Sequence, residues 1–128
     1  MSKTSINARL AMIQAFASFM DNGSQSATVI FYEGVQPVDT SVAADSNNAL
    51  VTLTFPEPCI KETTSTYVEL HPTDTGSVVK AGTATWARIF NGAGEVAADL
   101  TVGTDITLAN TSLALGGSFQ VNSFKIRP

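Results

Sequence analysis

The sequence predicts a mainly β protein, an antiparallel β-sandwich of Ig-like or jelly-roll-like type that carries one N-terminal α-helix. Short segments rich in β-branched and aromatic residues follow one another, separated by Gly, Pro, Asn and Asp. Helical periodicity is confined to the N-terminus. The 128 residues match the size of one compact domain. We therefore expect residues 1–128 to form a single domain.

The helix is expected over residues 4–21. Apolar residues recur there every three or four positions, from Ile6 to Met20, and this spacing aligns them along one face. Ser5 or the threonine before it can cap the N-terminus with a side-chain oxygen. The Asn and Gly that follow Asp21 are typical of a helix end.

Met12, Phe16 and Phe19 widen the apolar face of this helix beyond what a small domain needs. Two interpretations stay open. The helix packs deeply against a sheet, or these side chains dock on a neighbouring subunit, because a monomer rarely tolerates an exposed patch of that kind. The three residues are therefore candidate interface residues.

The strands are expected in order along the rest of the chain. The first, 27–33, carries large apolar groups on both faces and should be central, whereas 49–55 alternates and should be half-buried. Residues 37–48 are polar and predict a long exposed loop, and 62–66 lack apolar residues and predict a second loop. Further strands are expected at 67–71, 82–90, 95–102, 106–109 and 118–126, with 77–80 either a strand or a connection.

Trp86 is the only tryptophan and lies on an alternating strand, so we expect it in the core with its indole N–H bonded to backbone. Arg88 follows two positions later and should face the same side of the sheet. The pair predicts a cation–π contact, or a binding hot spot if that face is exposed. Both residues are candidate interface residues.

Side chains that could perform catalysis are sparse. His71 is the only histidine and Cys59 the only cysteine, so their number excludes an intrachain disulfide and a zinc site built on several such ligands. We expect Cys59 to be buried and His71 to be satisfied or to face solvent. Five aspartates, Asp39, Asp45, Asp74, Asp99 and Asp105, lie in or near predicted turns, where hydrogen bonds to backbone explain them. We predict no enzyme activity, no catalytic, cofactor-binding or metal site, and no cofactor.

Composition and charge limit the classes of partner that the protein is expected to bind. Charged residues make up 14% of the chain, below the roughly 25% usual in soluble proteins, which suits a protein that packs against neighbours. The net charge is −4 and the seven basic residues are scattered, so we do not expect nucleic-acid binding. The sequence has no apolar run of the roughly 20 residues needed to span a bilayer and no secretory signal, so we expect synthesis in a cytoplasm and no membrane partner.

Several segments together resemble a known group of proteins. They are the opening helix with Asn7-Ala8-Arg9, and residues 32–37, 82–89, 99–103 and 123–126. With these segments the chain resembles small β-sandwich virion structural proteins of tailed bacteriophages, of the decoration, neck or tail-associated type. The resemblance implies a non-enzymatic subunit present in many copies in the virion and made in the bacterial host cytoplasm. Its partners would be capsid, neck or tail subunits.

Three function hypotheses follow. The leading one is a capsid decoration or cement subunit, with the helix and the 37–48 loop as contact segments; a neck, collar or tail-associated subunit is a close variant. A carbohydrate- or receptor-binding module is an alternative of another class, for which Trp86, Tyr32 and Tyr67 are the available aromatics. A small hydrolase is the third, and it would need His71 as its base.

Overall fold

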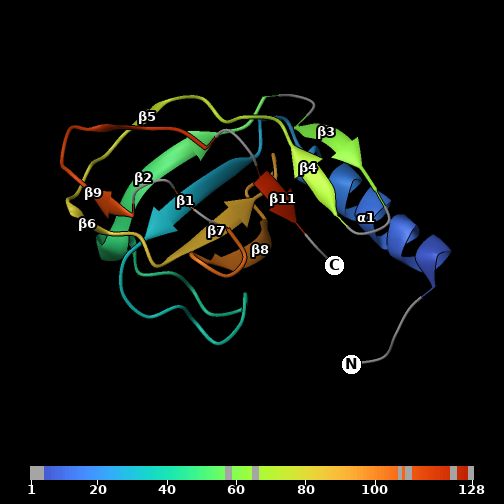
Figure 1. The fold of residues 1–128 in the computed structure, drawn as a ribbon, viewed down its shortest axis with the longest axis horizontal. Helices are drawn as coiled ribbons and strands as arrows, with labels where there is room; N and C mark the ends of the chain where they lie inside the picture. Colours follow the sequence, from blue (N-terminus) through green and yellow to red (C-terminus); the bar gives the residue numbers. More distant parts are fainter. Residues whose placement is uncertain are drawn as a thin grey trace.

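The computed structural model describes residues 5–56, 59–64, 67–106, 108, 111–121 and 124–126. Across these residues the protein is mainly β, its strands pair antiparallel, and one α-helix precedes them (Figure 1). The mainly β, antiparallel part of the fold prediction is confirmed.

Helix α1 spans Ile6–Met20. The Ser5 hydroxyl caps it by accepting the Ala8 N–H at 3.1 Å, and Gly23 follows its end in the left-handed region with φ +110°. The helix packs beside strands β3 and β8. In the part of the chain that the structure describes, no helix has both the length and the hydropathy to cross a membrane.

The largest sheet has four strands in the order β2-β1-β7-β8. Strand β1 (Thr28–Tyr32) lies between β2 (Ala49–Thr54) and β7 (Trp86–Phe90), and β8 (Val96–Thr101) pairs with the far side of β7. The prediction of a central strand near residue 30 is confirmed. Neighbours along the chain form the β1–β2 and β7–β8 pairs, so both are antiparallel hairpins.

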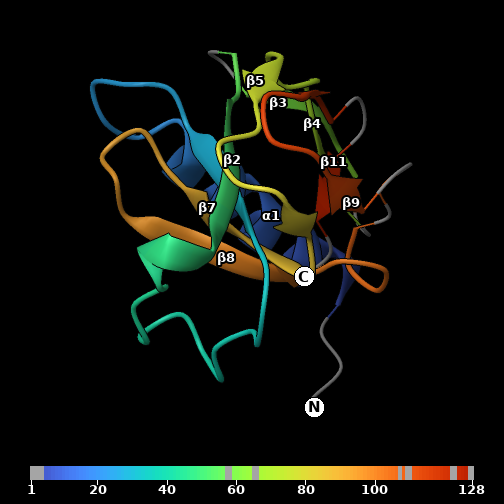
Figure 2. The same ribbon diagram turned by 90° about the vertical axis from the view of Figure 1, so that its left-hand side faces the viewer.

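Smaller sheets complete the fold (Figures 1 and 2). Strands β3 (Ile60–Thr63), β4 (Val68–Leu70) and β11 (Phe124–Ile126) form a sheet in the order β11-β4-β3. Two short pairs join distant segments: β5 (Gly76–Ser77) with β10 (Ser118–Phe119), and β6 (Gly82–Thr83) with β9 (Ser112–Leu113).

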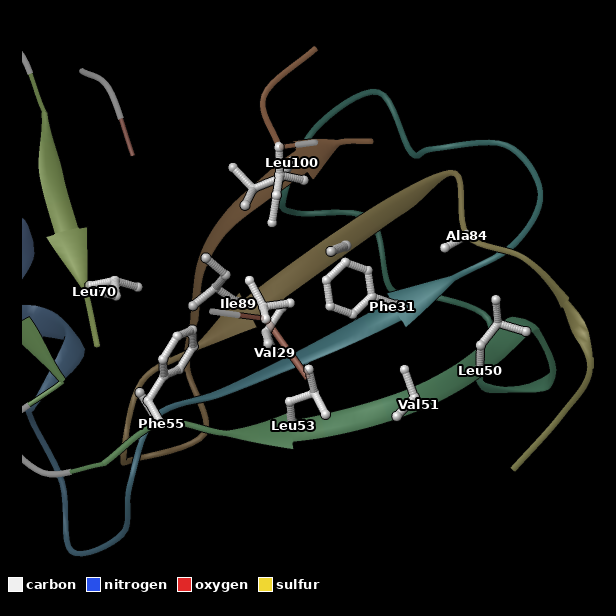
Figure 3. Packing of buried hydrophobic residues seen from close by; sticks show 14 of the residues in the cluster. Val29, Phe31, Leu50, Val51, Leu53, Phe55, Leu70, Ala84, Ile89 and Leu100 are labelled. Carbon is white, nitrogen blue, oxygen red and sulfur yellow. The ribbon is translucent and has the colours of Figure 1, made fainter. Parts of the chain in front are cut away.

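The hydrophobic core lies on one face of the four-stranded sheet (Figure 3). Cross-strand register places Val29 and Phe31 of β1 beside residues of β2 and β7 on that face. The Phe31 ring meets Phe119 of β10 edge to face at 5.3 Å, which joins the sheet to the C-terminal segment. Other core side chains come from α1, β4, β8, β9 and the connections: Met20, Cys59, Leu70, Val78, Leu100, Leu113 and Val121. The predicted burial of Cys59 is confirmed.

Some element predictions were wrong. The segment expected to be a loop at 62–66 contains the end of β3, whose backbone pairs with β4 although its side chains give no apolar alternation. The single strand expected at 82–90 is two, because Ala84 N–H donates to Thr111 at 2.8 Å and draws the chain away toward β9.

The last two predicted strands also differ. At 106–109, Ile106 forms only an isolated bridge with Val102, and residues 107 and 109 lie outside the described residues. The strand expected at 118–126 is β10 and β11, which pair with different partners.

Candidate functional site

The second face of the four-stranded sheet carries a polar and aromatic cluster. Cross-strand register aligns Tyr32, Trp86 and Thr101 in one row and Ile30, Arg88 and Asp99 in the next. These positions alternate with the core residues and therefore face away from the core. Trp86 and Arg88 share this face, as the sequence predicts.

Arg88 and Asp99 form a buried ion pair across β7 and β8. The guanidinium Nε donates to Asp99 Oδ1 at 2.7 Å and Nη2 donates to Oδ2 at 3.0 Å. The two side chains are only 3% and 7% exposed, so water screens the pair weakly. The hydrogen bonds from Arg88 to Asp99 raise the pKa of the arginine, which therefore stays charged.

The aromatic rings stack beside this pair. Tyr32 and Trp86 lie nearly parallel with centroids 4.4 Å apart, and Arg88 Cζ is 5.4 Å from the Trp86 ring. The predicted cation–π contact is therefore present. Burial raises the pKa of the Tyr32 hydroxyl.

Two sequence expectations about this cluster were wrong. Trp86 is buried, but its indole Nε1 has no hydrogen-bond partner among the described residues. Asp99 was expected in or near a turn, yet it lies in β8 and its carboxylate binds Arg88. Because Trp86 and Arg88 are buried, neither offers its side chain to a partner directly.

The cluster instead holds the β1–β2 loop, residues 33–48. Arg88 Nη1 donates to the carbonyl oxygen of Val42 at 2.7 Å. Gln36 and Thr101 are joined side chain to side chain at 2.6 Å, and the Thr85 hydroxyl donates to the Gly34 carbonyl at 2.7 Å. These three hydrogen bonds fix the loop at Gly34, Gln36 and Val42, and Figure 2 shows the loop projecting below the four-stranded sheet between β1 and β2.

The ends and the turn of this loop are fixed as well. Glu33 N–H donates to the Asn48 carbonyl at 3.0 Å, and the Asp45 carboxylate accepts from the Asn47 N–H at 2.9 Å, which caps the short 3₁₀ helix Ser46–Asn48. Lys80 donates to the Asn47 carbonyl at 2.8 Å. The two ends of the loop lie together, and its own side chains, such as that of Asp45, hydrogen-bond to its backbone. These are the properties of an Ω-loop.

Three valines are exposed among the polar residues of the loop. Val35 and Val38 are each 93% exposed and Val42 is also exposed. Asp39 lies among them, and hydrogen bonds from the hydroxyl and N–H of Ser41 hold the pKa of its carboxyl below the usual range. The prediction of a long exposed loop is confirmed, but that prediction did not include the exposed valines between the polar residues.

The helix candidates divide into two kinds. Met12 is exposed, whereas Phe16 is half-buried and packs against the core cluster. Phe19 is half-buried too. The structure therefore favours packing as the role of Phe16, and it leaves Met12 as the exposed residue of the three.

Other groups that bear on chemistry have structural partners. Asp74 and Asp105 accept backbone N–H groups of Thr54 and Thr101, both at 2.8 Å, as turn aspartates should. His71 donates its backbone N–H to Cys59 at 2.8 Å. Within the described residues no three His, Cys, Asp or Glu side chains come together as metal ligands would.

Comparison of the chain with models of known protein families, with curated proteins and with solved structures finds no match in any of the three.

Proposed function

We propose that this protein is a non-enzymatic structural subunit of a tailed-bacteriophage virion, and that it decorates and cements the assembled capsid. The observation that carries the proposal is the β1–β2 loop, where two almost fully exposed valines stand on a segment fixed to the fold. Exposed apolar groups on a fixed loop suit a contact with another protein. The sequence resemblance supplies the class of particle.

The proposed fold within this class is a β-sandwich. The four-stranded sheet would form one layer, and the β11-β4-β3 sheet with the short β5–β10 pair would form the other, across the core of Figure 3. The edge-to-face contact of Phe31 with Phe119 supports this arrangement, because it joins residues of the two proposed layers.

The mechanism would be additive. A contact made by a few loop residues is weak for one subunit, but a decoration protein bound at many equivalent sites strengthens the shell because repeated contacts act together. A neck, collar or tail-associated subunit would use the same loop. Its neighbour would be a neck or tail protein in place of a capsid protein, and the mode of contact would be the same.

The carbohydrate- or receptor-binding alternative has less support. Sugar platforms need exposed aromatic faces, whereas the rings of Tyr32 and Trp86 are buried and stack on each other. Tyr67 is half-buried. A glycan array with clear hits would favour this alternative despite the burial.

The test is the protein content and cryo-electron microscopy of phage particles released by the bacterium that produces this chain. We expect many copies per particle, with density for the chain on the capsid lattice. Density at the neck or tail would still support a virion structural subunit but would move it from the capsid to the neck or tail. Particles without the chain would contradict the proposal.

A further inference from the structure

We propose that residues 35–42 form a preorganised docking element, which places Val35 and Val38 in an apolar depression with a Lys- or Arg-rich rim on another virion protein. This inference rests on the proposed function and adds the binding segment and the chemistry of its partner.

Hydrogen bonds to the rest of the fold fix residues 35–42. Singly exposed valines are ordinary on protein surfaces, and in a mobile loop they would lose much conformational entropy on binding. Here the side chains of Thr85, Thr101 and Arg88 hold the loop at Gly34, Gln36 and Val42 respectively. Within the segment, Val42 N–H donates to the Asp39 carbonyl at 3.3 Å and closes a turn. Most of the ordering is therefore complete before a partner arrives.

The side chains of this segment point in two directions. Gln36 and Pro37 are half-buried on the inner side of the loop, whereas Val35 and Val38 on either side of them are 93% exposed. The anchored residues thus turn inward and the valines turn outward. Two apolar groups displayed by the same fixed turn fit a depression better than a flat surface.

The β1–β2 loop carries negative charge. Residues 10–60 contain no Lys, Arg or His, and the loop carries three acidic residues. Lys80 lies 3.4 Å from the Glu33 carboxylate, but Asp39 and Asp45 are exposed and keep net negative charge beside the valines. A partner with basic groups around its apolar depression complements this surface, and one with acidic groups is repelled.

Strand addition is the main competing mode of contact in a β protein, and the edges of the four-stranded sheet oppose it. The free edge of β2 is occupied, since Asp74 N–H donates to Thr54 and Val79 N–H donates to Leu50, both at 2.9 Å. Strand β8 carries a register shift opposite Ile89 and Phe90, and Asp105 accepts the Thr101 N–H. Bulges and blocked N–H groups protect an edge from pairing, so a loop contact is the better route on this sheet.

The experiment is site-specific photo-crosslinking in cells and particles that contain the full chain. A benzophenone amino acid replaces Val38 in one variant and Val79 in a matched control, because Val79 is 68% exposed but lies outside the loop. We expect adducts from position 38 at least about tenfold above those from position 79, as burial of two valines implies. The crosslinked partner peptide should contain Lys or Arg next to apolar residues.

Two sets of variants complete the test. Val35→Ser with Val38→Ser should lower incorporation into particles about tenfold or more, whereas Val79→Ser should not. Asp39→Asn with Asp45→Asn should weaken binding and reduce its dependence on salt. Equal crosslinking from positions 38 and 79, or a partner peptide without basic residues, would overturn the inference.

These outcomes separate the inference from the proposed function. A chain that is present in particles but shows no specific adduct from position 38 overturns the docking element and leaves the virion assignment standing. A specific adduct to a basic, apolar peptide of a protein outside the particle retains the docking segment and the chemistry of its partner but rejects a virion protein as that partner, and with it the virion assignment.

Discussion

Replacement of Asp99 by Leu should destabilise the protein far more than an ordinary surface change, because it leaves the Arg88 guanidinium buried without its counter-ion. The structure gives the scale of the effect. The pair has two charge-assisted hydrogen bonds, 2.7 and 3.0 Å long, and the side chains are 3% and 7% exposed. Breaking a buried pair of this kind costs about 3–5 kcal/mol.

We expect the lower end of that range, about 3 kcal/mol, because Arg88 keeps its bond to the Val42 carbonyl and its contact with the Trp86 ring. In a chain of 128 residues, a loss of that size lowers Tm by roughly 10 °C. Urea unfolding gives the free energy directly. Far-UV circular dichroism should be the main probe, and fluorescence of the single tryptophan a second, because Trp86 adjoins the altered site.

A double variant separates the ion pair from the packing. Arg88→Met with Asp99→Leu removes both charges and fills the site with apolar groups, so it should be less destabilised than Asp99→Leu alone. An Asp99→Leu variant within about 0.5 kcal/mol of the parent protein would refute the assignment of a buried pair, as would a double variant whose loss equals the sum of the two single losses.

Other substitutions test other parts of the structure. Trp86→Ala should cost about 3–5 kcal/mol in denaturant unfolding. Trp86→Phe should cost less, because it keeps a ring and removes an indole N–H that has no partner among the described residues. Equal losses of stability in the two variants would contradict this prediction. Burial raises the pKa of Tyr32 above 10.0, so the stabilisation that the neutral hydroxyl gives is complete below pH 10 and is lost as pH rises through the folded-state pKa. Tyr32→Phe should therefore flatten the fall in unfolding free energy at alkaline pH. An unchanged pH profile of stability in this variant would contradict the prediction. A Cβ at Gly92 would lie 1.9 Å from the Gln25 carbonyl oxygen, so Gly92→Ala should cost about 1–3 kcal/mol in thermal unfolding, and a neutral result would place that backbone further apart. Phe16→Asp should destabilise the fold because Phe16 packs against the core, whereas Met12→Asp should leave Tm nearly unchanged and, if the helix is also an interface, lower only incorporation into particles.

Local patterns in the sequence predict much of the main sheet. The β-branched run around Val29 and the alternation around Leu53 each mark a strand, because side-chain burial on a sheet leaves a period of two. Strand β3 was missed since Lys61 and Glu62 carry no such period. Its position depends on backbone pairing with β4 and on packing beside α1, which are tertiary effects that one segment does not encode.

The candidate site was predictable only in part. The two-residue spacing of Trp86 and Arg88 places them on one face, and the cation–π contact follows from that spacing. The partner Asp99 lies eleven residues further along the chain, and its role depends on the β7–β8 register, which the turn between those strands sets. The contact from Arg88 to Val42 crosses 46 positions and has no local signal in the sequence.

The structure also indicates what the buried ion pair contributes. Stability alone does not require it, because apolar residues of similar volume often serve as well or better in a sheet interior. An apolar pair cannot donate a hydrogen bond to the Val42 carbonyl, whereas an arginine held by Asp99 can do so with its remaining Nη1 group. The pair therefore positions the β1–β2 loop. In the Arg88→Met, Asp99→Leu double variant, hydrogen exchange should quicken in residues 33–48 and stay slow in the four-stranded sheet. Exchange that quickens equally in both would mean that the pair stabilises the whole fold and has no separate effect on the loop.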